Sequence, residues 1–112
     1  MSAPRLTADF WVSAYLARLR RAGLPGYVLA RGDNTAGAVM VKLATLDGQA
    51  QLWQRLFDPI AERRDWVRTA EGLETDIDAR LARERARDPD LWVIEVEDRA
   101  GRHLLDDSGL DG

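Results

Sequence analysis

Leu91-Trp92-Val93-Ile94-Glu95-Val96 is the stretch of sequence that decides the fold. Large apolar and β-branched side chains dominate it, which is typical of a β-strand. Trp92, Ile94 and Val96 share one face of this strand, because side chains two residues apart point the same way. The Glu95 side chain points to the opposite face. We expect so apolar a strand to lie at or near the centre of a sheet, and we expect Trp92 to be buried.

The chain that follows this strand is predicted to turn back and close the sheet. Asp98-Arg99-Ala100-Gly101 has the composition of a tight turn, and Arg102-His103-Leu104-Leu105 is predicted to be a short final strand. That hairpin would bring His103 toward Glu95 and Glu97. Residues 107–112 are small and acidic, and they are expected to form a frayed tail.

Two helices are predicted from apolar side chains that recur at helical spacing. The first extends from about Ala8 to Ala22, after Thr7 as its N-cap and before Gly23. The second begins near Leu73 and ends before Asp88-Pro89. Its acidic residues lie near its start and its arginines near its end, which is the order that the helix dipole favours.

The segments between the two helices are predicted to be strands. Tyr27–Arg31 and Ala38–Leu46 are expected to pair through a turn at residues 32–37, and Asp65–Thr69 alternates as a half-buried strand does. With the hairpin at Asp47-Gly48, these strands form a meander. The elements together predict a single α+β domain over residues 1–112, ordered over about residues 6–106, with a mostly antiparallel sheet of four to six strands and both helices on one face.

Asp47-Gly48 is the clearest turn signal in the sequence. A two-residue type I′ turn there places Leu43 opposite Leu52 and Lys42 opposite Trp53. Lys42 would then lie over the ring of Trp53 on one face of the sheet. The other, more apolar face would carry Val39, Val41, Leu43, Ala50 and Leu52.

Composition narrows the function classes. A chain of 112 residues with 46% hydrophobic residues can fill one core. The absence of cysteine excludes disulfides, thiolate nucleophiles and cysteine-ligated metals. The net charge of −3 does not favour nucleic-acid binding. No apolar run has membrane-spanning length and no signal-peptide pattern is present, so a cytoplasmic location is expected.

Two sets of residues are candidate sites. His103, Glu95 and Glu97 would offer nitrogen and oxygen ligands to a metal ion, which is the basis of a small metal-dependent hydrolase hypothesis. A set of arginines could grip phosphates or an acidic partner, which is the basis of an RNA- or nucleotide-binding hypothesis. These arginines are Arg63, Arg64, Arg80, Arg83 and Arg87.

Several sequence blocks together resemble domain-of-unknown-function family 1491, over about Leu6 to Asp106. The blocks are Phe10-Trp11-Val12, Arg31-Gly32-Asp33, Ala36-Gly37-Ala38-Val39, Asp88-Pro89-Asp90-Leu91-Trp92-Val93 and Glu95-Val96-Glu97-Asp98-Arg99. The resemblance implies a short, uncharacterised alphaproteobacterial protein, and it supplies no activity, substrate or catalytic residue.

A non-enzymatic binding or interaction module is the function that the sequence favours. Four tryptophans and many arginines suit recognition, whereas no convincing catalytic set assembles. No cofactor is predicted. The expected partner is another protein or a second copy of the chain. Nucleic acid is disfavoured as a partner, although RNA or nucleotide binding stays an alternative, and no role at a membrane is expected.

Overall fold

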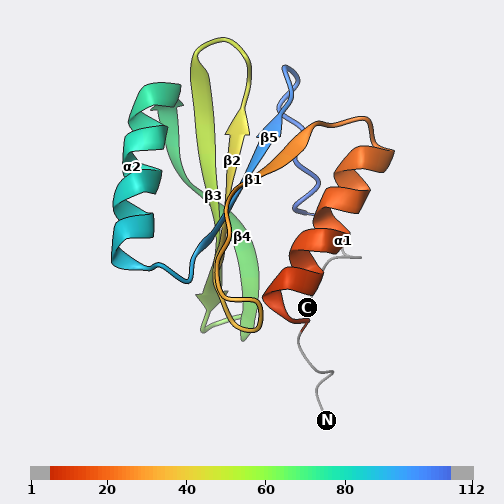
Figure 1. The fold of residues 1–112 in the computed structure, drawn as a ribbon, viewed down its shortest axis with the longest axis vertical. Helices are drawn as coiled ribbons and strands as arrows, with labels where there is room; N and C mark the ends of the chain where they lie inside the picture. Colours follow the sequence, from red (N-terminus) through yellow and green to blue (C-terminus); the bar gives the residue numbers. More distant parts are fainter. Residues whose placement is uncertain (1–5, 107–112) are drawn as a thin grey trace.

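A computed structural model describes residues 6–106, which form two helices and five strands (Figure 1). Both helices lie within about a residue of the predicted bounds, and neither is long and apolar enough to cross a membrane. The predicted acidic tail, residues 107–112, lies outside the described residues. In chain order the elements are α1 (Ala8–Arg21), β1 (Gly26–Ala30), β2 (Val39–Ala44), β3 (Gln49–Asp58), β4 (Arg63–Leu73), α2 (Glu74–Arg87) and β5 (Trp92–Glu97).

One sheet contains all five strands, in the order β1-β5-β2-β3-β4. The α+β class is therefore confirmed, and so is the internal position of β5. The pairs β1–β5, β2–β3 and β3–β4 are antiparallel, whereas β2 and β5 are parallel. The sheet is thus mixed, although antiparallel pairing predominates as expected.

The predicted meander is wrong at β1 and β2, because β5 lies between them. Residues 31–38 are not a hairpin turn; they cross the end of β5. The Trp92 backbone N–H donates to the Ala38 carbonyl at 2.8 Å, and the Trp92 ring N–H donates to the Asp33 carbonyl at 2.7 Å. The strand with the continuous apolar run from Leu91 to Ile94 has thus taken an internal position.

The hairpin at Asp47-Gly48 is present, but the predicted register is wrong by one residue. Thr45 pairs with Gln49 around a three-residue loop, in which Leu46 and Gly48 have positive φ angles of 63° and 85°. The Asp47 carboxylate holds this loop by accepting from the Thr45 hydroxyl at 2.6 Å and the Gln49 N–H at 3.0 Å. As a result Lys42 lies opposite Leu52 and not opposite Trp53.

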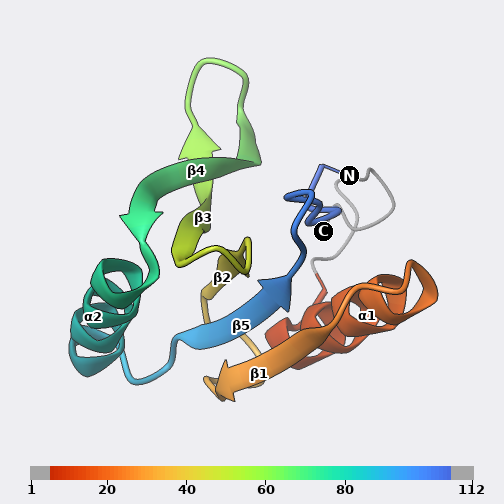
Figure 2. The same cartoon turned by 90° about the horizontal axis from the view of Figure 1, so that it is seen from above.

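Because of this one-residue difference in register, each side chain of β3 points to the opposite face of the sheet from the one predicted. Val41 and Leu43 pack against α1, whereas Ala50 and Leu52 pack against α2. The two helices therefore cover opposite faces (Figure 2), and the prediction that both lie on one face is wrong. The reason is that β2 and β5 carry apolar side chains on both faces, and each face needs its own cover.

The predicted final strand at residues 102–105 does not form. The chain after β5 instead runs along the α1 face as an irregular segment, in which Leu105 is buried. The Tyr15 hydroxyl of α1 donates to the His103 carbonyl at 2.7 Å and anchors this segment. The Tyr15 hydroxyl thus gives the His103 carbonyl the hydrogen bond that a neighbouring strand would otherwise supply.

Lys42 is the one buried charged side chain in the core of the described residues. Its ammonium lies 2.7 Å from each of three carboxylates, those of Glu74 and Asp78 on α2 and Glu95 on β5. Burial by itself would lower the pKa of Lys42, but the hydrogen bonds to Asp78, Glu74 and Glu95 outweigh it and raise the pKa above its usual value. The contacts tie the first turns of α2 to the sheet.

Lys42→Met is expected to lower the free energy of unfolding by about 2–4 kcal/mol, because three carboxylates would lose their common cation. The loss should be smaller than for a wholly buried pair, since Glu74 and Asp78 are partly exposed. Urea denaturation measures it. Arg68→Met is the control: Arg68 and Glu71 form an exposed pair, so less than about 1 kcal/mol should be lost.

The pH dependence of this stabilisation has a defined sign. The pKa of Lys42 is higher in the folded chain than its ordinary value of 10.5, so the stabilisation is complete below that value and is lost as pH rises through the folded pKa. The stability gap between wild type and Lys42→Met should stay level from about pH 7 to pH 10 and shrink in more alkaline solution. A gap that closed near neutral pH would contradict this account.

Trp92→Ala is expected to lower the free energy of unfolding by about 3–5 kcal/mol. The predicted burial of Trp92 is confirmed, since the residue is 1% exposed, and its ring N–H also holds the crossing loop at Asp33. Thermal unfolding with calorimetric detection measures the loss. If Trp92→Ala melted at the wild-type temperature, neither the packing nor the loop contact would contribute to stability.

Candidate functional site

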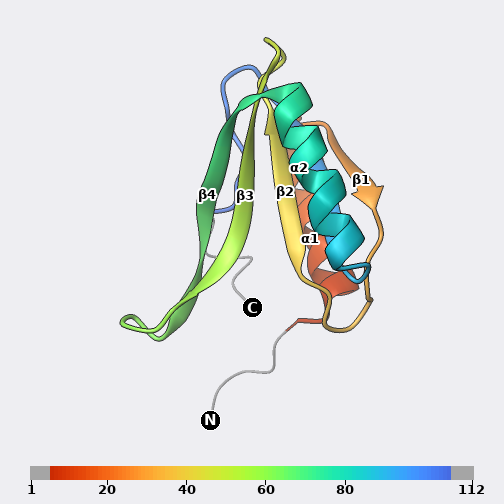
Figure 3. The ribbon, with the colours of Figure 1, turned by 90° about the vertical axis from the view of Figure 1, so that its left-hand side faces the viewer.

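A cavity of about 510 Å³ lies where the β3–β4 hairpin extends past the start of β2. The β2–β3 pairing stops at Met40 and Gln54, whereas the β3–β4 pairing continues to Asp58 and Arg63. The outer part of the hairpin thus swings away from β2 (Figure 3). The volume is in the range of sites for small molecules. The lining comes from the start of α1, residues 35–40, β3, β4 and the end of α2, together with Leu6 and Leu91.

The crossing loop forms one wall of the cavity and is held in a single shape. The Asp33 carboxylate accepts the N–H groups of Thr35 and Ala36 at 3.1 and 2.8 Å. Gly37 packs so closely on the Asp90 carbonyl that an added Cβ would overlap the oxygen. The loop carbonyls of Asn34 and Thr35 accept the first N–H groups of α1 at 3.0 and 3.1 Å, so these amides already have partners.

Two tryptophans form an aromatic wall. Trp11 of α1 and Trp66 of β4 stack with ring centroids 5.3 Å apart and an angle of 30° between their planes. Trp11 also stacks on Tyr15 at 4.9 Å, which anchors the wall in the α1 core. The wall thus offers aromatic surface beside the cavity, and it is anchored in the core through Trp11.

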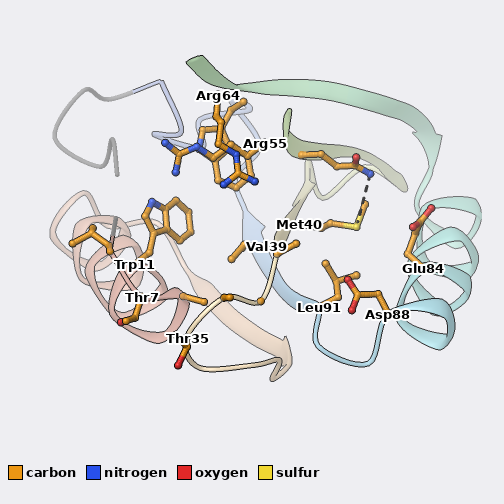
Figure 4. A pocket seen from close by; sticks show the side chains of 17 residues that line it. Thr7, Trp11, Thr35, Val39, Met40, Arg55, Arg64, Glu84, Asp88 and Leu91 are labelled. Atoms are coloured by element: carbon orange, nitrogen blue, oxygen red, sulfur yellow. Dashed lines mark hydrogen bonds between the residues drawn. The ribbon is translucent and has the colours of Figure 1, made fainter. Parts of the chain in front are cut away.

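Two arginines of the hairpin lie above this wall. Arg55 is paired with Trp66 in the β3–β4 ladder, and Arg64 lies two residues before Trp66, so all three side chains share a face. Figure 4 shows the guanidinium groups of Arg55 and Arg64 near each other, above Trp11. Arg55 is half-buried and Arg64 is exposed. Each offers a planar set of donors suited to a carboxylate or phosphate.

The other end of the cavity is acidic. Glu84 and Asp88 line it at the end of α2, across from the arginines (Figure 4). Glu84 accepts a hydrogen bond from Arg87 at 2.6 Å, and one oxygen of Asp88 accepts the Asp90 N–H at 3.1 Å. Between the two ends, Met40 is 4% exposed and packs with the α2 core.

The predicted cluster of His103, Glu95 and Glu97 is not assembled. His103 lies on the α1 side, where its ring packs against Trp53 with centroids 4.3 Å apart and a tilt of 49°, and its Nδ1 accepts the Leu105 N–H at 2.9 Å. Glu95 bonds Lys42 on the α2 side. Glu97 hydrogen-bonds Tyr27 and raises the pKa of that phenol. Within residues 6–106, no group of three or more side chains of the metal-ligating types could hold a metal ion.

The predicted arginine set is divided between two places. Arg64 lines the cavity, and its neighbour Arg63 points elsewhere and pairs with Asp65 at 3.2 Å. Arg87 pairs with Glu84, while Arg80 and Arg83 are on α2 and do not line the cavity. Sequence reasoning missed Arg55, Trp11 and Trp66 as a group. The face that Arg55 shares with Trp66 depends on the β3–β4 register, and Trp11 reaches Trp66 only through the packing of α1 on the sheet.

The fold and the cavity define a small α+β protein with one mixed sheet between two helices and a ligand-sized cavity beside the sheet. Residues 6–106 match the family model described as a protein of unknown function, DUF1491. The chain belongs to this family, and the resemblance seen in the sequence is confirmed. No curated protein matches the chain.

Three solved structures are similar to this chain, and two of them are of DUF1491 family proteins. The crystal structure of a DUF1491 family protein from Caulobacter crescentus CB15 is 38% identical, with a TM-score of 0.79, over 90% of this chain and 93% of that one. The NMR structure of a DUF1491 family protein from the same organism is 37% identical, with a TM-score of 0.79, over 93% and 96%. Protein Atu0922 from A. tumefaciens is 31% identical, with a TM-score of 0.70, over 84% and 86%.

Gly37→Ala is expected to lower the free energy of unfolding by about 1–3 kcal/mol, because the new methyl group would overlap the carbonyls of Asp90 and Asp33. Ala36→Ser, on the exposed neighbour, is the control and should change stability by less than about 0.5 kcal/mol. Urea denaturation measures both. Equal stability of Gly37→Ala and wild type would show that the loop adapts and does not form a fixed wall.

Proposed function

We propose that this protein is a non-enzymatic binding module that holds a small ligand in the cavity by an anionic group. One observation carries the proposal: Arg55 and Arg64 present two guanidinium groups to the same cavity, above the Trp11–Trp66 wall. An anion between two guanidinium groups can receive paired, charge-assisted hydrogen bonds from each.

The surroundings of the arginines support binding through an apolar body as well as an anionic head. Val39, Leu6 and the tryptophans add apolar lining next to the guanidinium groups. The ligand class is a carboxylate or phosphate monoester on an apolar body.

Octyl phosphate and octanoate are the probes for this function, with octanol as the neutral control of equal chain length. We expect both anions to bind in isothermal titration calorimetry and to raise the melting temperature, and octanol to do neither. Arg64→Gln and Arg55→Gln should each weaken binding by about 1.5–3 kcal/mol, the worth of a hydrogen bond to a charged group.

Arg63→Gln is the matched control, because Arg63 is adjacent in sequence, exposed and absent from the cavity lining. It should leave affinity unchanged. Urea denaturation of each variant separates lost binding from lost folding. If Arg63→Gln and Arg64→Gln weakened ligand binding equally, the effect would come from the net charge of the surface, and the proposed site would be wrong.

A further inference from the structure

We infer that the ligand is a zwitterion with an apolar middle, whose acidic group lies on Arg55 and Arg64 and whose cationic nitrogen lies on Glu84 and Asp88. This inference rests on the proposed function, since it names the second end of the same ligand. Figure 4 shows the two charged pairs on opposite sides of one cavity, with Val39, Met40 and Leu91 between them.

The lining carries two guanidinium groups at one end and two carboxylates at the other, and Arg87, which is outside the lining, already pairs with Glu84. The carboxylate end offers a simple anion no binding partner. A ligand that carried only a negative group would bind the arginines, while its apolar body would displace water from Glu84 and Asp88 without replacing the lost hydrogen bonds. A ligand with a cationic nitrogen at its far end replaces those bonds with charge-assisted ones.

The end of α2 is suited to a cation for two independent reasons. Asp88 directly follows the last residue of α2, where the helix dipole is negative. Each carboxylate also retains acceptor capacity, because a carboxylate offers about four acceptor positions. Glu84 uses one oxygen for Arg87, and Asp88 uses one for the Asp90 N–H. A ligand ammonium can therefore bind here without displacing Arg87.

The middle of the cavity suits a flexible aliphatic segment. Met40 and Leu91 are each 4% exposed, so their side chains present a fixed apolar floor. The thioether of Met40 is in contact with the Gln54 amide at 3.9 Å, which fixes its place. An unbranched chain can cross this floor and set the separation between the two charged ends.

The experiment uses the full chain and a series of unbranched alkanoates with an amine on the terminal carbon: aminobutanoate, aminohexanoate, aminooctanoate and aminododecanoate. Each is compared with the alkanoate and the alkylamine of the same length by isothermal titration calorimetry. We expect affinity to peak at one length and, at that length, to exceed that of the plain alkanoate about tenfold or more.

Glu84→Gln and Asp88→Asn should remove this advantage of the amine and leave alkanoate binding in place. Both substitutions keep an oxygen for the existing hydrogen bonds, so folding should be retained. Asp76→Asn is the control, because Asp76 is exposed on the first turn of α2 and does not line the cavity. It should leave the length dependence unchanged.

Two results would overturn the inference. The first would leave the proposed anion site valid, and the second would not. If plain alkanoates bind as tightly as the amino acids of equal length and Glu84→Gln changes neither, the ligand has one charged end and the proposed anion site survives. If neither series binds and octyl phosphate also fails to bind, the anion site itself is wrong.

Discussion

Other parts of the chain pack against both faces of β5, and the rest of the fold is arranged around this strand. Trp92, Ile94 and Val96 pack under α1, while Val93 packs with the α2 core on the other side. Since each face must be covered, the helices are separated by the sheet. Since each edge must be paired, β1 and β2 take the two sides of β5 and cannot pair with each other.

The cavity is a consequence of this constraint. When β5 separates β1 from β2, the connecting residues have to cross the end of β5, and they pack on the Asp90 carbonyl through Gly32 and Gly37. An alanine Cβ at either glycine would overlap that carbonyl, so the loop approaches β5 only with glycine there. The blocks by which the sequence resembles its family, at residues 31–33, 36–39 and 88–93, thus meet in space beside the cavity.

Electrostatics ties the second helix to the same framework. The acidic start of α2 suits the helix dipole, but in the folded chain Glu74 and Asp78 also bond the buried ammonium of Lys42. The third carboxylate on Lys42 comes from β5, so the central strand and α2 share one cation. This shared contact positions the whole helix, and with it the acidic end of the cavity at Glu84 and Asp88.

Local features of the sequence were enough to place both helices and the central strand. Their apolar periods, together with terminators such as Gly23 and Asp88-Pro89, depend only on neighbouring residues, and so does the hairpin at Asp47-Gly48. The tertiary structure alone decided the strand order, the face of each helix and the grouping of Arg55, Arg64, Trp11 and Trp66. A single positive φ at Leu46 shifts the β2–β3 register by one residue and thereby exchanges the faces of β3. Such long-range pairing follows from the burial of both faces of β5 by distant segments, and no local pattern in the chain encodes which segments those are.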